Sequence, residues 1–492
     1  MSATNKLFSG FLWSFGSVGA NVIIRIVVLA VLARKLTPEI YGIFSVFSMI
    51  SGFFEFFGRA WIQNNIISRK DIHEDDFINT TFTFGLINSL LLILLMAPLG
   101  YYIFSQFDVP DPSQLTLFTV IAIAFYGFAI VNISILRKTL KFKTIAKIDV
   151  ITNILCQAIP SLIMAFLGYG LMALIIPTLF QLFVRSLMLF LSQPLKLKLR
   201  INKKAAKVLI SNYWSLNSGV FMNYFATRGD NLIVGRFIGT EALGFYGRAF
   251  NIAKMPTNLF GSTMDKVLFP ILASNDVSDE NRKKSFLLLS FIISLFGLTL
   301  SLLLTTFSAQ IVSIILGPQW IGVSGLLGIL GFATFFRLAY KISISQLLVQ
   351  RKFRMLSNMQ ITITIIMLIL CYLGTYLGVE YVAGATTLAI ILQYTYLNII
   401  ACKEIGVNLK EFIEAHRLPL LFTTCSTIII GLMHYWVPDV LSSNYFFFAY
   451  SIALFVLIGL ILFAIPSSNE YTNWWRQKIS EFLFKKKKRK NN

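Results

Sequence analysis

The chain is predicted to turn between two apolar helices in the stretch ARKLTPEIYGIF, residues 33–44, and again in the stretch GRFIGTEALGFY, residues 235–246. At a constant offset of 202 residues, the two stretches share an arginine, a glutamate and a glycine. The similarity resumes at offsets near 210, where KFK at 141–143 matches KFR at 352–354, and Gly168 and Ala173 match Gly378 and Ala383. Recurrence at three places predicts an internally repeated fold.

The composition around these turns is that of a polytopic membrane protein. Of the 492 residues, 56% are hydrophobic and only 13% are charged, and 46 are phenylalanine. An ordinary globular protein has about 25% charged residues, so most of this chain has no aqueous face. In a soluble protein the net charge of +21 would favour a nucleic-acid partner. Here the excess is attributed to membrane orientation, and no nucleic acid is expected.

We predict fourteen membrane spans, because a transmembrane helix needs about 20 consecutive apolar residues. The expected limits are 7–32, 40–67, 78–104, 114–135, 148–167, 171–192, 208–234, 243–270, 285–307, 322–348, 357–377, 381–402, 418–436 and 445–465. The fold class is therefore an all-α polytopic membrane protein. Six helices per repeat is an even number, so the two repeats keep one orientation, as in transporters built from parallel repeats.

Four parts of the chain are expected. Residues 1–201 form an N-terminal lobe and residues 202–402 a C-terminal lobe, each of six helices. Residues 403–465 hold helices 13 and 14. Residues 466–492 form a cytoplasmic tail that is amphipathic and then polybasic, which favours contact with an anionic leaflet.

The lysines and arginines predict the orientation. If the N-terminus is cytoplasmic, the inside segments carry 31 basic residues and the outside segments carry 3. Positive charge in short loops stays on the cytoplasmic side. Both termini are therefore predicted to be cytoplasmic.

Nine basic residues lie inside the predicted spans, where a charge at mid-bilayer costs about 2.5–3.5 kcal/mol. Arg25, Arg59, Arg248 and Lys254 lie many residues from the cytoplasmic end or deep in their spans, and we predict that they line a wet cavity. Four further residues are candidates for a cavity or coupling role: Glu55, Arg228, Asp230 and Arg337. Arg228 and Asp230 are interpreted as a structural ion pair. The three histidines are too dispersed for a metal site, and no cofactor is expected, although coupling to an ion or to the membrane potential stays open.

The stretch from Arg228 to Tyr246, and the Val267–Pro270 segment before a short charged loop, resemble the seventh-to-eighth helix signature of Wzx-type polysaccharide flippases. These belong to the MOP (multidrug/oligosaccharidyl-lipid/polysaccharide) superfamily, and the similarity is to the colanic-acid and teichuronic-acid exporter branch. The turn at 33–42 fits the same family, and the resemblance extends over essentially the whole chain.

The resemblance implies a bacterial inner-membrane flippase that moves undecaprenyl-diphosphate-linked oligosaccharide from the cytoplasmic to the outer leaflet. Its partners would be that lipid-linked substrate, the phospholipid bilayer and other polysaccharide assembly proteins. Related lipid II flippases use arginines on helices 1, 2 and 8 in a central cationic cavity, which implies that role for Arg25, Arg59 and Arg248. Lys254 is included for its position alone.

Two other functions remain as alternatives. A multidrug or organic-cation exporter of the same superfamily needs acidic cavity residues, and Glu55, Asp230 and Asp265 are the clear cases in the spans. A membrane polysaccharide polymerase or ligase needs a sizeable outer loop or an acidic catalytic pair. The only outside carboxylate pair, Asp108 and Asp111, lies beside prolines and is typical of a turn, so no catalytic residues are assigned.

Overall fold

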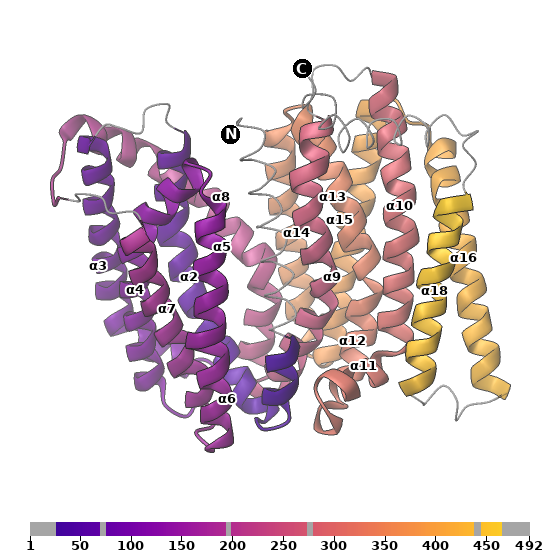
Figure 1. The fold of residues 1–492 in the computed structure, drawn as a ribbon, viewed down its shortest axis with the longest axis horizontal. Coiled ribbons are helices and arrows are strands. Elements are labelled where there is room, and N and C mark those ends of the chain that lie inside the picture. Colours follow the sequence, from indigo (N-terminus) through magenta and orange to yellow (C-terminus); the bar gives the residue numbers. More distant parts are fainter. Residues whose placement is uncertain (1–25, 69–74, 193–197, 273–278, 437–443, 465–492) are drawn as a thin grey trace, which may run out of the picture. The chain divides into compact units, whose positions relative to one another are not determined.

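The computed structural model describes residues 26–68, 75–192, 198–272, 279–436 and 444–464. All regular elements in these ranges are helical, which confirms the predicted all-α membrane fold (Figure 1). Within them, nine helices are long and apolar enough to cross a bilayer, and a helix bent by 41° near residue 129 would be a tenth. The count of fourteen spans stays a prediction, and the first span and the cytoplasmic tail lie mainly or wholly outside the described residues.

The chain divides into two compact units. Unit 1 takes Met1–Asn251, Val312–Leu326 and Ser357–Thr386, and unit 2 takes Ile252–Ile311, Leu327–Leu356 and Thr387–Asn492. The boundaries between them fall within helices, because residues 251 and 386 each lie inside a continuous helix.

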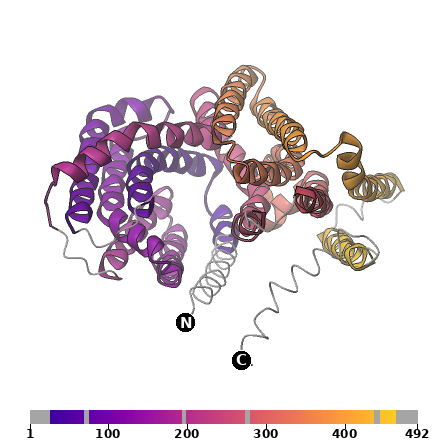
Figure 2. The ribbon, with the colours of Figure 1, turned by 90° about the horizontal axis from the view of Figure 1, so that it is seen from above.

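Unit 1 contains a bundle in which α4 packs against α2, α3 and α7, and the four helices lie side by side in Figure 1. Seen from above, α8 runs obliquely across this bundle (Figure 2). The elements of unit 1 are α2 (Pro38–Ser68), α3 (Asp75–Ser105), α4 (Pro112–Lys138), α5 (Phe142–Thr152), the π-helical η1 (Asn153–Ala158), α6 (Ile159–Phe166), α7 (Met172–Ser192), α8 (Lys203–Phe237), the first part of α9 (Thr240–Leu272), most of α14 (Phe353–Gly374) and the start of α15 (Val379–Ile405).

Unit 2 is organised around α10, which packs against α13 and α16. Its core contains Phe286 and Ile293 of α10 together with Phe335 and Leu338 of α13, all at most 5% exposed. Besides the rest of α9, α14 and α15, its elements are α10 (Asp279–Thr306), most of α12 (Val323–Phe332), α13 (Thr334–Val349), α16 (Leu409–Trp436) and α18 (Asn444–Ala464).

Two tight helix hairpins have the backbone that their glycines predict. Gly168 and Gly170, between α6 and α7, have φ values of +81° and +51°, and Gly378, before α15, has a φ of +122°. Residues with a Cβ rarely adopt this left-handed region, whereas glycine does so at little cost. The short connections therefore force the neighbouring helices into antiparallel pairs.

The predicted outer loop at 308–321 is instead mostly helical. It forms α11 (Ser308–Ile315) and the 3₁₀ turn η2 (Pro318–Trp320). The Trp320 side chain is fully buried, and its indole nitrogen donates to the carbonyl oxygen of Ala33 at 2.7 Å. Because burial of apolar surface is favourable, this segment folds back onto the chain and removes its apolar side chains from water.

The two repeated turns pack against each other in a reciprocal way within unit 1. A Cβ placed on Gly42 would overlap the carbonyl group of Thr240, and a Cβ placed on Gly244 would overlap the carbonyl group of Pro38. Gly244 and Thr240 follow Gly42 and Pro38 by the same 202 residues. An exchange of partners between equivalent positions is what a local two-fold axis produces. The shared glycines of the repeat therefore lie where the α2 and α9 backbones touch.

Candidate functional site

Arg248 of α9, one of the predicted cavity residues, packs its guanidinium against an aromatic ring. It lies about 12 Å along the helix from Thr240, at 1.5 Å per residue. Its guanidinium lies over the ring of Tyr41, with the carbon 4.2 Å from the ring centroid. Within the described residues, neither a hydrogen bond nor a carboxylate pairs its charge, and its buried Nε has no hydrogen-bond partner. A cation held on an aromatic face keeps its forked donors for an anion.

Tyr41 is in turn held by the repeated turns and by η2. It is 3% exposed, and its ring meets that of Trp320 edge-on at 5.4 Å. Phe245 also contacts Trp320 edge-on, at 5.9 Å between ring centroids. The Tyr41 ring under the Arg248 guanidinium is thus held in place by Trp320, which lies about 280 positions later in the sequence.

The other two predicted arginines are not placed in full. Arg25 lies outside the described residues, and Arg59 lies in α2 with its side chain outside them. Glu55, one turn earlier on α2, is partly buried. The cavity roles of these three residues stay predictions.

Lys254 and Arg337 lie on neighbouring helices of unit 2. The hydroxyl of Thr334 donates to the carbonyl oxygen of Ala253 at 3.3 Å, and Nζ of Lys341 donates to that of Thr257, also at 3.3 Å. These two bonds bracket Lys254 on α9 and Arg337 on α13. Arg337 is 6% exposed and Lys254 is partly buried. The two basic residues, 83 positions apart in the sequence, therefore lie on helices that contact each other.

The predicted ion pair between Arg228 and Asp230 is wrong. Arg228 is exposed, whereas Asp230 is 2% exposed, and no ion pair joins them in the part of the chain that the structure describes. Residues two positions apart on a helix point to different sides, so they do not face each other.

Asp230 is bound instead by hydroxyl and amide groups. The Tyr246 hydroxyl lies 2.8 Å from one carboxylate oxygen, and the backbone and side-chain amides of Asn231 each donate to the other at 2.9 Å. The Tyr246 oxygen also lies 2.9 Å from the Thr386 hydroxyl, and Cys371 lies 3.5 Å from Thr386. The buried carboxylate of Asp230 on α8 is thus satisfied by neutral donors, as buried polar groups require.

Sequence reasoning missed Tyr41, Tyr246 and Thr386 as partners of the charged residues. Tyr41 lies in the repeated turn next to the shared Gly42, and this position in the repeat could have indicated it as a candidate. Nothing in the sequence indicated Thr386, because it lies 140 residues from Tyr246.

Comparison with known proteins agrees with this architecture. Residues 31–325 match the family described as polysaccharide biosynthesis protein. The teichuronic acid biosynthesis protein TuaB of Bacillus subtilis is 24% identical over 68% of this chain and 70% of its own length. The lipopolysaccharide biosynthesis protein WzxC of Escherichia coli is 23% identical over 67% of each chain.

Two solved structures share the fold. The lipid II flippase MurJ, in an inward closed conformation, aligns with a TM-score of 0.74 over 95% of this chain and 99% of its own, at 16% identity. An inward-facing multidrug resistance MATE transporter of the MOP superfamily aligns with a TM-score of 0.57 over 78% of this chain and 94% of its own, at 13% identity. The chain has the polytopic fold of MOP-superfamily transporters and belongs to the polysaccharide biosynthesis protein family.

Proposed function

We propose that this protein is a flippase that carries undecaprenyl-diphosphate-linked oligosaccharide from the cytoplasmic to the outer leaflet of the bacterial inner membrane. The family match and relatives named for teichuronic acid, lipopolysaccharide and succinoglycan biosynthesis support the polysaccharide pathway. The shared fold with a lipid II flippase supports a lipid-linked substrate. The carrier alternates access between two six-helix lobes, residues 1–201 and 202–402.

One observation carries the proposal: a partly buried arginine, on a helix predicted to span the membrane, whose charge is held on an aromatic ring instead of on a carboxylate. Arg248 has this arrangement over Tyr41, at 4.2 Å. A diphosphate presents oxygens that match the planar fork of a guanidinium. Arg25, Arg59 and Lys254 complete the cationic cavity, with Glu55, Arg228, Asp230 and Arg337 as further cavity or coupling residues.

The membrane potential supplies a driving force in this scheme. A dianion moving outward gains about 5 kcal/mol per 100 mV, at about 2.3 kcal/mol for each charge. Cationic residues neutralise the bound diphosphate, so the field acts mainly on the empty, positive cavity. It pulls that cavity back toward the cytoplasm and resets the carrier.

Complementation tests the proposal. A strain that lacks its own flippase for an undecaprenyl-diphosphate-linked oligosaccharide, but keeps the matching glycosyltransferases, should regain surface polysaccharide when it expresses this chain. Accumulation of the lipid-linked repeat unit inside the cell should fall in parallel. Resistance to organic cations without restored polysaccharide would instead identify a multidrug exporter. Longer polymer without any change in translocation would identify a polymerase.

The proposed orientation gives a second expected outcome. In a Cys425→Ser background, which removes the exposed native thiol, an impermeant thiol reagent should label Thr37→Cys and Ser113→Cys in intact cells. It should label Lys204→Cys, an exposed residue in a segment predicted to be cytoplasmic, only after the membrane is opened. Labelling of residue 204 in intact cells would reverse the orientation.

A further inference from the structure

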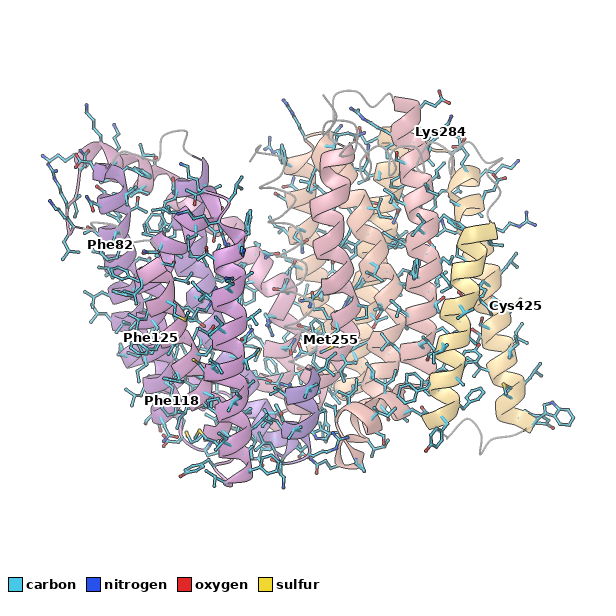
Figure 3. The ribbon with its side chains drawn as sticks, in the orientation of Figure 1. Phe82, Phe118, Phe125, Met255, Lys284 and Cys425 are labelled. Atoms are coloured by element: carbon cyan, nitrogen blue, oxygen red, sulfur yellow. The ribbon has the colours of Figure 1, made fainter. Side chains whose placement is uncertain are left out.

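The start of α8 carries exposed aliphatic side chains beside exposed lysines at the end of a membrane bundle. The segment follows α7, a candidate span that ends at Ser192, and lies against the beginning of the span in α3. This places it at the boundary between the bilayer and water. Phe82, which belongs to the core cluster beneath it, marks that end of unit 1 in Figure 3.

Hydrogen bonds fix this segment along α3. The backbone amides of Lys198, Arg200 and Asn202 donate to the side chains of Asn79, Thr83 and Thr80, at 2.8, 3.1 and 2.9 Å. Side chains of an extended chain alternate between two sides. The alternate residues therefore face away from α3, and Leu199 and Ile201 are 75% and 53% exposed.

The first turns of α8 continue this pattern on a helix. Ala205 and Leu209 are 7% and 0% exposed in the core cluster, and Asn202 caps the helix by accepting from the Lys204 amide at 2.9 Å. The opposite side presents an open groove of about 460 Å³, lined by Ile201, Lys203, Ala206, Lys207, Ile210 and Ser211. Ile210 is 60% exposed.

Lys203 and Lys207 are four residues apart, so their side chains are neighbours on one helix face. In the ranges that the structure describes, neither has an ion-pair or hydrogen-bond partner. Lys204, which is also exposed, adds a third positive charge beside them. Two adjacent ammonium groups next to aliphatic side chains match a phosphate attached to acyl chains.

We propose that this groove binds the headgroup phosphate of an anionic phospholipid of the adjoining leaflet. The phosphate lies between Lys203 and Lys207, and the first acyl carbons lie on Ile201 and Ile210. The lipid stabilises the contact between the start of α8 and α3. This binding does not depend on the proposed transport function, because it concerns a membrane lipid and not the cargo.

The test uses a fluorophore at the groove and a lipid that quenches it. Full-length protein with Cys402→Ser, Cys425→Ser and Ser211→Cys is labelled with bimane and reconstituted into phosphatidylcholine nanodiscs. Brominated phosphatidylglycerol should quench at a much lower mole fraction than brominated phosphatidylcholine. The K203Q/K207Q variant should raise the mole fraction for half-quenching by about 30-fold, since each basic residue near an anionic surface contributes about 1 kcal/mol.

A matched control removes the same charge elsewhere. Lys403 and Lys410 are exposed lysines at the ends of α15 and α16, and K403Q/K410Q should leave quenching unchanged. Equal quenching by the two brominated lipids, or selectivity that survives K203Q/K207Q, would overturn the proposal. Displacement of brominated phosphatidylglycerol by an equal amount of undecaprenyl diphosphate would also overturn it, since it would assign the groove to the cargo. Loss of transport in any variant would leave these readings unaffected.

Discussion

Replacing Arg248 with glutamate is expected to abolish polysaccharide export, because the variant repels the diphosphate that the arginine would bind. Arg248→Ala should reduce export about 30- to 150-fold, the equivalent of about 2–3 kcal/mol for hydrogen bonds to a charged group. Arg248→Lys should recover only part of this loss, because an ammonium keeps the charge but not the planar fork. The measurement is surface polysaccharide in a flippase-null strain at matched membrane levels of each variant.

The control for this series is Arg236→Ala, which removes a positive charge from an exposed residue at the end of α8. Its export should stay near that of the unmodified protein. Tyr41→Phe keeps the ring under the guanidinium and should be mild, whereas Tyr41→Leu removes that ring and should resemble Arg248→Ala. Full export by Arg248→Glu would contradict the cationic-cavity proposal.

Adding one methyl group at Gly42 or Gly244 is expected to destabilise the protein strongly. In each case the new Cβ would overlap a backbone carbonyl group, Thr240 for Gly42 and Pro38 for Gly244, so the helices must move apart. Overpacking of this kind costs about 1–3 kcal/mol. Because the two contacts are equivalent, Gly42→Ala and Gly244→Ala should lower the thermal midpoint in detergent by similar amounts.

Gly52→Ala is the matched control, since Gly52 lies on α2 as well and has open space where its Cβ would lie. It should be neutral or slightly stabilising, because alanine favours helices more than glycine does. Equal stability of Gly42→Ala and Gly52→Ala would show that the α2 and α9 backbones do not touch at Gly42.

The sequence by itself determined the fold class, most helix limits and the hairpin turns. Helix length and apolar composition are local properties, so the span predicted at 40–67 corresponds to α2 at Pro38–Ser68. Gly168 and Gly378 were informative for the same reason, because a left-handed backbone needs glycine wherever it occurs. The repeat was also visible from the sequence, although not that its glycines touch.

The tertiary structure decided the partners of the charged residues. Helical periodicity gives the face on which Arg248 or Asp230 lies, but it does not give the helix that this face meets. The guanidinium of Arg248 lies over the ring of Tyr41 on α2. Asp230 is hydrogen-bonded to Tyr246, which is hydrogen-bonded in turn to Thr386, and it does not pair with Arg228. The segment 308–321, predicted as an outer loop, likewise forms α11 and η2, with Trp320 buried against Ala33. Such contacts join residues up to 287 positions apart, and they form only when packing brings distant helices together.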